Sequence, residues 1–184
     1  MIHNRIADLT AAIARLDQTP DSRVPKLDKG LRNLVSRHYI PPVARDGRAD
    51  LYDATGMIVL RLAERAQTFG LDRASLESFI RFLQSAPDMP QDWREGDGKR
   101  AALTRIEIAL NRARAGEDFY LGLAMGRDGA LTPVAEWQES PVSDEAAQII
   151  ADYRAATGER SEPDAVLRLP AGRLIREILD ALGA

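Results

Sequence analysis

The Pro41-Pro42 step is the feature that most constrains how this chain can fold. Neither proline can donate a backbone hydrogen bond, and the first biases Ile40 away from helical geometry, so a helix has to end here. Apolar residues at helical spacing predict that helix over residues 25–38. After the prolines, Asp46-Gly47 predicts a type I′ turn within a hairpin over residues 43–52, because glycine accepts positive φ without steric cost.

Positive charge is concentrated in the segment around this step. Residues 21–48 contain seven basic and three acidic side chains, a balance of +4, so the remaining residues carry −7 of the total charge of −3. A cationic face on an acidic body can contact phosphates while the protein stays selective. The alternative is a solvated surface helix with ordinary charges.

Length and composition set the outer limits of the fold. The chain has 184 residues, 45% of them apolar, which allows one domain, or a small domain with an appended one. No apolar run approaches the roughly 20 residues that span a bilayer, and the start alternates charged and apolar residues, unlike a secretory signal. We therefore expect a soluble protein with no membrane partner, and the cytoplasm is the default compartment. Without cysteine, a disulfide framework and thiolate metal sites are excluded.

The remaining patterns predict helices, with short β segments in the second half. The expected helices cover residues 2–17, 25–38, 55–69, 74–83, 99–115, 144–156 and 171–182. A second hairpin is expected over residues 119–137, around Gly126-Arg127-Asp128-Gly129, and a short strand over 166–169. The predicted organisation is mainly α with small β hairpins. An N-terminal winged helix-turn-helix covers residues 1–86, a linker 87–98, and a small α+β dimerisation or effector region 99–184.

Different short motifs follow one another through residues 30–83, each at a definite place in the predicted helix, hairpin or helix pair. They are Leu31-Arg32, Tyr39-Ile40-Pro41-Pro42, the arginine and glycine of the wing, Leu51-Tyr52-Asp53, Leu60 with Leu62, and Phe69-Gly70-Leu71. This pattern resembles the DNA-binding part of the MerR family of bacterial transcription regulators. The chain departs from the family at Asn33-Leu34, where two tyrosines are usual, and at Ala49, near the place of a phosphate-contacting arginine.

The resemblance implies a sequence-specific transcription regulator that binds double-stranded DNA as a homodimer. It assigns DNA contacts on the recognition helix to Lys26, Lys29, Arg32, Asn33, Ser36 and Arg37. On the wing it assigns them to Arg45 and Arg48, while Tyr52 either reaches a phosphate or packs across the hairpin. Arg61 and Arg65 are expected to touch flanking phosphates or to be ordinary surface charges. The helix over residues 99–115 would dimerise the protein or belong to its core.

Other functional classes have less support in the sequence. No phosphate loop, nucleophile elbow or paired nucleophile and histidine is present, so no enzyme activity and no cofactor are predicted. His3 and His38 lack metal-ligand spacing, and no metal site is predicted. A small-molecule effector pocket and a modest core explain a set of aromatic and acidic residues equally well: Phe119, Tyr120, Glu136, Trp137 and Tyr153.

Two further alternatives remain open from the sequence. One is a DNA-bending or excision-type architectural factor of a phage or mobile element. The other is a winged-helix protein-interaction module that no longer binds DNA. The first predicts several closely spaced sites, and the second predicts that Arg32 and Arg48 are dispensable.

Overall fold

Two N-terminal helices begin the fold and each contributes one apolar face to the core. In the computed structural model, which describes residues 3–38, 40–87, 93–96, 99–135, 137 and 163–183, helix α1 is Ile6–Leu16 and helix α2 is Val24–His38. A short 3-10 turn, η1 (Asp21–Arg23), leads into α2. The helix predicted over residues 25–38 is confirmed. The helix predicted from residue 2 begins only at Ile6, because the residues before it are extended.

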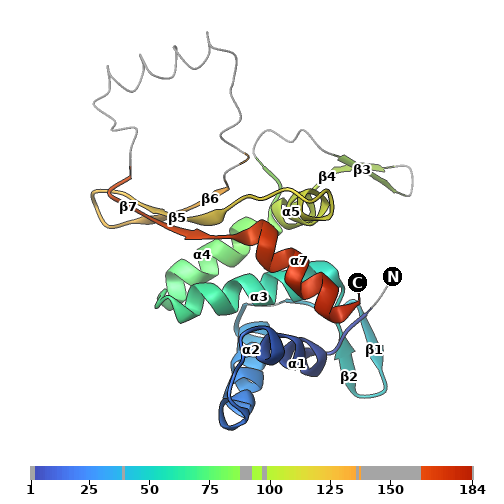
Figure 1. Cartoon of the computed structure of the whole chain (residues 1–184). Helices are drawn as coiled ribbons and strands as arrows, with labels where there is room; N and C mark the ends of the chain where they lie inside the picture. The colour runs from blue at the N-terminus through green and yellow to red at the C-terminus, as the bar shows by residue number, and fades with distance from the viewer. Residues whose placement is uncertain are drawn as a thin grey trace, which may run out of the picture.

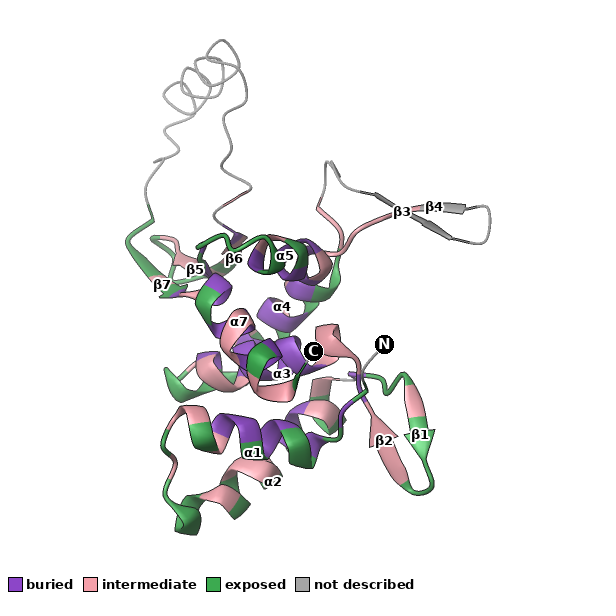
Figure 2. Cartoon of the chain, turned by 45° about the vertical axis from the view of Figure 1, so that its right-hand side comes forward, coloured by how far each residue is buried: buried purple, intermediate pink, exposed green. Residues whose placement is uncertain are grey.

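The predicted hairpin is present, and the N-terminal segment extends it. Strand β1 (Ala44–Asp46) pairs antiparallel with strand β2 (Ala49–Leu51). Asn4 then exchanges two backbone hydrogen bonds of 2.9 Å with Tyr52, directly after β2. This pairing holds residue 4 in an extended conformation and explains the late start of α1. Figures 1 and 2 both show the hairpin projecting away from the helices.

The turn of this hairpin differs from the expected one. Asp46 pairs with Ala49, so the two loop residues are Gly47 and Arg48 rather than Asp46 and Gly47. Gly47 has φ of +60°, whereas Gln18 is the only non-glycine residue with positive φ in the described part of the chain. A type I′ turn needs positive φ at both loop positions, so the type I′ prediction is wrong. Glycine at the first position alone fits a type II′ turn.

Helices α3 (Ala54–Thr68) and α4 (Arg73–Gln84) follow the hairpin and confirm the predicted helix pair. Aspartates cap both: the carboxylates of Asp53 and Asp72 accept backbone N–H bonds of 2.9 and 2.7 Å. Gly70, with φ of +89°, makes the turn between the helices. Residues 57–63 of α3 are all buried, so α3 is surrounded by other elements and forms the centre of the protein.

The segment after α4 corrects two predictions. Strands β3 (Trp93–Gly96) and β4 (Lys99–Ala102) pair antiparallel where a linker and the start of a helix were expected. The helix itself, α5, is Arg105–Arg114. Its start is set by a capping box in which the Thr104 N–H donates to Glu107 at 2.8 Å and Glu107 N–H donates back to the Thr104 hydroxyl. This Thr-x-x-Glu signal is readable in the sequence and marks the boundary that apolar spacing alone missed.

A three-stranded antiparallel sheet and a final helix complete the chain. Strand β5 (Leu121–Met125) lies between β6 (Leu131–Ala135) and β7 (Ala165–Leu169). The predicted second hairpin and the predicted short strand are therefore confirmed. Helix α7 (Ala171–Leu182) matches its predicted range, and the helix predicted over residues 144–156 lies outside the described residues.

One hydrophobic cluster joins both halves of the chain. Helix α7 packs on α1 and α3, and α5 packs on α3, α4 and α7, so residues of both predicted domains share a core. Figure 1 shows α7 crossing the middle of the protein, between the sheet and the first two helices. The apolar stripe of α5 belongs to this core, which favours the core alternative over the dimerisation alternative. The predicted class, mainly helical with small antiparallel sheets, is confirmed. Among the described helices, none is long and apolar enough to cross a membrane.

Candidate nucleic-acid interface

Helix α2 separates its apolar and polar residues onto opposite faces. Leu31 and Leu34 are buried, and Leu27 and Val35 pack against the same core. The other face carries four of the predicted contact residues, all exposed and at helical spacing: Lys26, Lys29, Asn33 and Ser36. We call these four residues the α2 stripe. Two lysines, an amide and a hydroxyl on one exposed face offer donors to phosphates and to base edges alike.

Arg32 lies beside the α2 stripe and already has a partner. Its guanidinium donates to the Asp28 carboxylate from Nε at 2.7 Å and from Nη2 at 3.3 Å. The Thr10 hydroxyl of α1 donates to the same carboxylate at 3.2 Å. The Arg32 hydrogen bond therefore holds the pKa of Asp28 below its ordinary value, against a smaller effect of burial. This i,i+4 pair is solvent-exposed, and such pairs contribute only about 0.3 to 0.5 kcal/mol.

The hairpin carries one engaged and one free arginine. Arg45 donates to Asp50 on the opposite strand at 2.8 Å, and Asp46 forms an ion pair with Arg5 from the N-terminal segment. Arg48 is exposed at the turn and makes no ion pair with any described residue. Of the two predicted wing arginines, Arg48 is thus the one whose charge is uncompensated.

Tyr52 lies in the core rather than on the surface. The residue is only 2% exposed and belongs to the main hydrophobic cluster. Burial raises the pKa of its phenol above the ordinary value and the nearby Asp50 raises it further, while Arg32 lowers it. These properties fit the packing alternative for Tyr52. The effect of Arg32 on this phenol also shows that one flank of α2 lies near the base of the hairpin.

Arg61 is neither a phosphate contact nor a surface charge, and both predicted roles for it are wrong. Its side chain is 2% exposed and binds Asp17, at the end of α1, through two hydrogen bonds of 2.7 and 2.8 Å. Glu64 accepts a third bond from Arg61 at 3.0 Å, and Arg65 pairs with the same Asp17. The network ties α1 to α3, and no local sequence signal indicates which face of α3 meets Asp17.

The cations that remain free define the candidate surface. Neither Lys26, Lys29 nor Arg37 on α2, nor Arg48 at the turn, has an ion-pair partner among residues that the structure describes. Neutralised cations give little net attraction to a phosphate, so these four carry the electrostatic potential of the surface. Arg37 and Lys26 lie at opposite ends of α2, so the potential extends along the whole helix.

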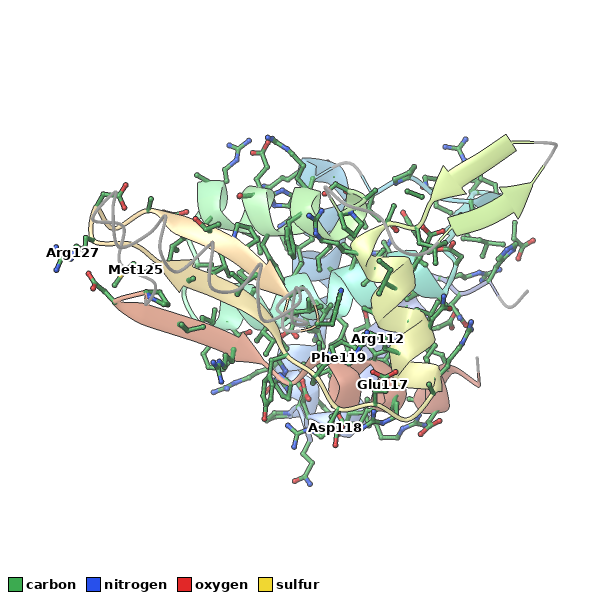
Figure 3. All side chains as sticks on the ribbon, turned by 90° about the horizontal axis from the view of Figure 1, so that it is seen from above. Arg112, Glu117, Asp118, Phe119, Met125 and Arg127 are labelled. Carbon is green, nitrogen blue, oxygen red and sulfur yellow. The ribbon has the colours of Figure 1, made fainter. Side chains whose placement is uncertain are left out.

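The candidate effector residues are only partly brought together. Phe119 and Trp137 form an edge-to-face pair with ring centroids 4.9 Å apart, and Arg112 lies 5.7 Å from the Trp137 ring. Tyr120 borders a separate open cavity of about 380 Å³ that Phe119 also lines. Figure 3 shows Phe119 and Arg112 near α5, far from Arg127 at the tip of the β5–β6 hairpin. Glu136 and Tyr153 lie outside the described residues.

Arg73 is a surface residue that the sequence analysis missed. It is exposed at the first position of α4 and lines a cavity together with Arg37 and His38 of α2. In the sequence, Arg73 is marked only as the residue that follows the N-terminal cap Asp72, which gives no indication of a binding surface. The proximity to α2 arises because α2 and α4 both pack on α3.

Comparison with protein-family models, with curated proteins and with solved structures found no match. The resemblance of residues 30–83 to MerR regulators therefore stays a prediction from the sequence motifs.

Proposed function

We propose that this protein is a sequence-specific transcription regulator that binds duplex DNA through an N-terminal winged helix-turn-helix. In this proposal α2 enters the major groove with the α2 stripe, and the β1–β2 hairpin is the wing. The observation that carries the proposal is the combination of an exposed polar face on α2 with uncompensated cations and a projecting hairpin that ends in Arg48. The alternative, a solvated surface helix with ordinary charges, accounts for the polar face of α2 but not for the projecting hairpin with an uncompensated arginine beside it.

The residues of this surface differ in what they contribute to the proposed DNA binding. Lys26 and Lys29 bind phosphates, which fixes orientation without reading sequence. Asn33 is the best candidate for base reading, since an amide can pair bidentately with adenine. Arg32 can pair with guanine once it leaves Asp28, and the exposed pair costs only about 0.3 to 0.5 kcal/mol to break. A good bidentate base contact contributes about 1 to 3 kcal/mol of discrimination against a wrong base, which is more than the cost of leaving Asp28.

We further propose that the DNA-bound form is a homodimer. One small headgroup contacts few base pairs, and two-fold symmetry doubles the contacts and sets the spacing of half-sites. The apolar face of α5 is already used inside one chain, so the dimer contact has to come from another surface. Sedimentation of the protein with and without its selected duplex tests this part separately.

The test is selection of genomic DNA fragments by the purified full chain at about 0.15 M salt, where weak phosphate-only binding largely fades. Recovery of a small set of palindromic fragments is the expected result. Arg48→Ala should then weaken binding to them and lower the slope of log K against log salt by about 1. The matched control is Arg127→Ala, which removes an exposed arginine from the turn of the β5–β6 hairpin.

A second pair of variants separates reading from attraction. Lys29→Ala should weaken binding to all duplexes alike, whereas Asn33→Ala should relax the preference at one base position, with a loss of about 1 to 3 kcal/mol on the preferred sequence. If the wild type enriches no fragment, or if Arg48→Ala and Arg127→Ala behave alike, the proposed interface is wrong. The winged segment would then be a scaffold, and the search would move to protein partners.

A further inference from the structure

A polar groove runs between α2 and α4, beside the α2 stripe. It consists of two adjoining cavities of about 120 and 210 Å³ that share Arg37 and His38. At about 30 Å³ per water molecule, the smaller cavity alone has the volume of about four waters. The groove is therefore large enough for a small oxyanion and part of its hydration shell.

The charges that line the groove are mainly positive. Arg37 comes from α2, while Arg73 and Arg81 come from α4, and Glu77 is the only carboxylate among the described residues that line the groove. Glu77 is occupied by Arg81, which donates to it at 2.9 Å. Arg37 and Arg73 have no ion-pair partner among the described residues, so both guanidinium groups are available to a ligand.

Uncharged donors complete the lining of the groove. The Asn33 and Gln67 side chains border the smaller cavity. The Nδ1 atom of His38 is buried and has no hydrogen-bond partner. Because Nδ1 is buried, the groove is lined by other atoms of the His38 ring, which lies close enough to a ligand there to report its charge. Two guanidinium groups and two side-chain amides that line one small cavity are a donor set that suits a phosphate group.

We propose that the groove between α2 and α4 binds a phosphate-type oxyanion, held by Arg37 and Arg73 beside His38. The oxyanion is either free in solution or part of a DNA backbone. Because Arg37 also belongs to the proposed DNA surface, a free anion in the groove would compete with DNA for that residue. The binding of a free anion does not depend on the proposed DNA-binding function, and its test contains no DNA.

The electrostatics of His38 provide a direct readout. Burial lowers the pKa of His38 below its ordinary value of 6.5, the charges of Arg73 and Arg37 lower it further, and Glu77 raises it. A bound anion opposes the effect of the two arginines and should raise the pKa of His38. The chain has one other histidine, His3, which is exposed near the N-terminus and serves as an internal control.

The first experiment follows both histidines by NMR between about pH 5 and 8 in the full-length protein. Sulfate is the probe, because its charge stays constant over this range, and chloride at equal ionic strength is the reference. We expect sulfate to raise the pKa of His38 by about 0.5 to 1 and to leave that of His3 unchanged. Equal shifts of both histidines report only screening and overturn the proposal. It is also overturned if the pKa of His38 shifts with none of sulfate, inorganic phosphate and the selected duplex.

A variant then tests whether the arginines hold the anion. Arg73→Gln should raise the pKa of His38 in chloride, because one lowering charge is gone, and that rise also reports that the groove is folded. The affinity for sulfate should fall about tenfold with the loss of one charged hydrogen-bond donor. Arg114→Gln, an exposed arginine on α5, is the matched control and should change neither value. Unaltered sulfate affinity in Arg73→Gln overturns the assignment.

The two sources of the oxyanion are distinguished by repeating the titration with the selected duplex and with inorganic phosphate. A shift of His38 with inorganic phosphate supports a site for a free anion. A shift with the duplex but with neither small anion supports a backbone phosphate, and Arg73→Gln should then lower the salt slope by about 1. If the protein binds no DNA but responds to sulfate or phosphate, the groove assignment stands and the regulator proposal fails.

Discussion

Breaking the buried ion pair between Asp17 and Arg61 should cost far more stability than breaking an exposed one. The substitution is Asp17→Asn, which keeps the shape of the side chain and removes its charge. Arg61 is 2% exposed and Asp17 17% exposed, so the Arg61 guanidinium cannot regain water when its partner is neutralised. Asparagine keeps only one acceptor oxygen, so one of the two hydrogen bonds from Arg61, of 2.7 and 2.8 Å, would be lost and the other would no longer join two opposite charges.

The expected loss is about 3 kcal/mol in the free energy of unfolding. Removal of one partner of a buried ion pair typically costs about 3 to 5 kcal/mol. We take the lower end because Glu64 remains within 3.0 Å of Arg61 and because Asp17 is partly reached by solvent. An effective dielectric constant of about 20 gives a similar size, about 4 kcal/mol for unit charges about 4 Å apart.

Urea unfolding measures this loss directly. With a slope of about 1 to 3 kcal/mol per molar, the midpoint of Asp17→Asn should fall by about 1 M or more at unchanged slope. The matched control is Glu77→Gln, which breaks the exposed Glu77–Arg81 pair and should cost no more than about 0.5 kcal/mol. Arg61→Met, which replaces the buried charge with an apolar chain, should cost less than Asp17→Asn. Equal midpoints for Asp17→Asn and Glu77→Gln would refute the reasoning.

The same pair also predicts a dependence on pH. Burial raises the pKa of Asp17, but the hydrogen bonds and charges of Arg61 and Arg65 outweigh it and hold the pKa below the ordinary value of 3.8. The stabilisation is therefore fully present above about pH 3.8 and is lost as the pH falls through the lower pKa of the folded state. The difference in unfolding free energy between wild type and Asp17→Asn should shrink as the pH is lowered. A constant difference over this range would contradict the assignment of the charge to Asp17.

Three substitutions by alanine should separate positions where the native residue is required from positions where it is not. Thermal or urea unfolding measures the stability of all three variants. Gly30→Ala should stabilise α2 by about 0.5 to 1 kcal/mol, since an added Cβ meets nothing within 4 Å; a loss would contradict the open surface. Gly122→Ala should prevent correct pairing of β5 with β7, because its Cβ would lie 1.9 Å from the Leu167 carbonyl oxygen; wild-type stability would contradict this register. Thr104→Ala should cost about 1 kcal/mol through loss of the Glu107 capping box, and no change would show that the cap is not needed.

Local sequence signals determined most of the secondary structure. Pro41-Pro42 ended one helix, Gly70 separated two others, and Asp72 marked a helix start, because each acts on backbone atoms within a few residues of itself. The α2 stripe was equally predictable, since an amphipathic helix exposes the residues opposite its leucines. The boundary error at α5 came from following apolar spacing past the Thr104 cap.

Tertiary structure alone decided which charges are free. The sequence predicted both Arg61 and Arg48 on the surface, yet only Arg48 is exposed, while Arg61 is buried against Asp17. Arg73 lines the groove beside Arg37 only because α2 and α4 both pack on α3. The physical reason is that burial and pairing of a side chain depend on segments far along the chain. Backbone propensities, which the sequence displays directly, depend on immediate neighbours.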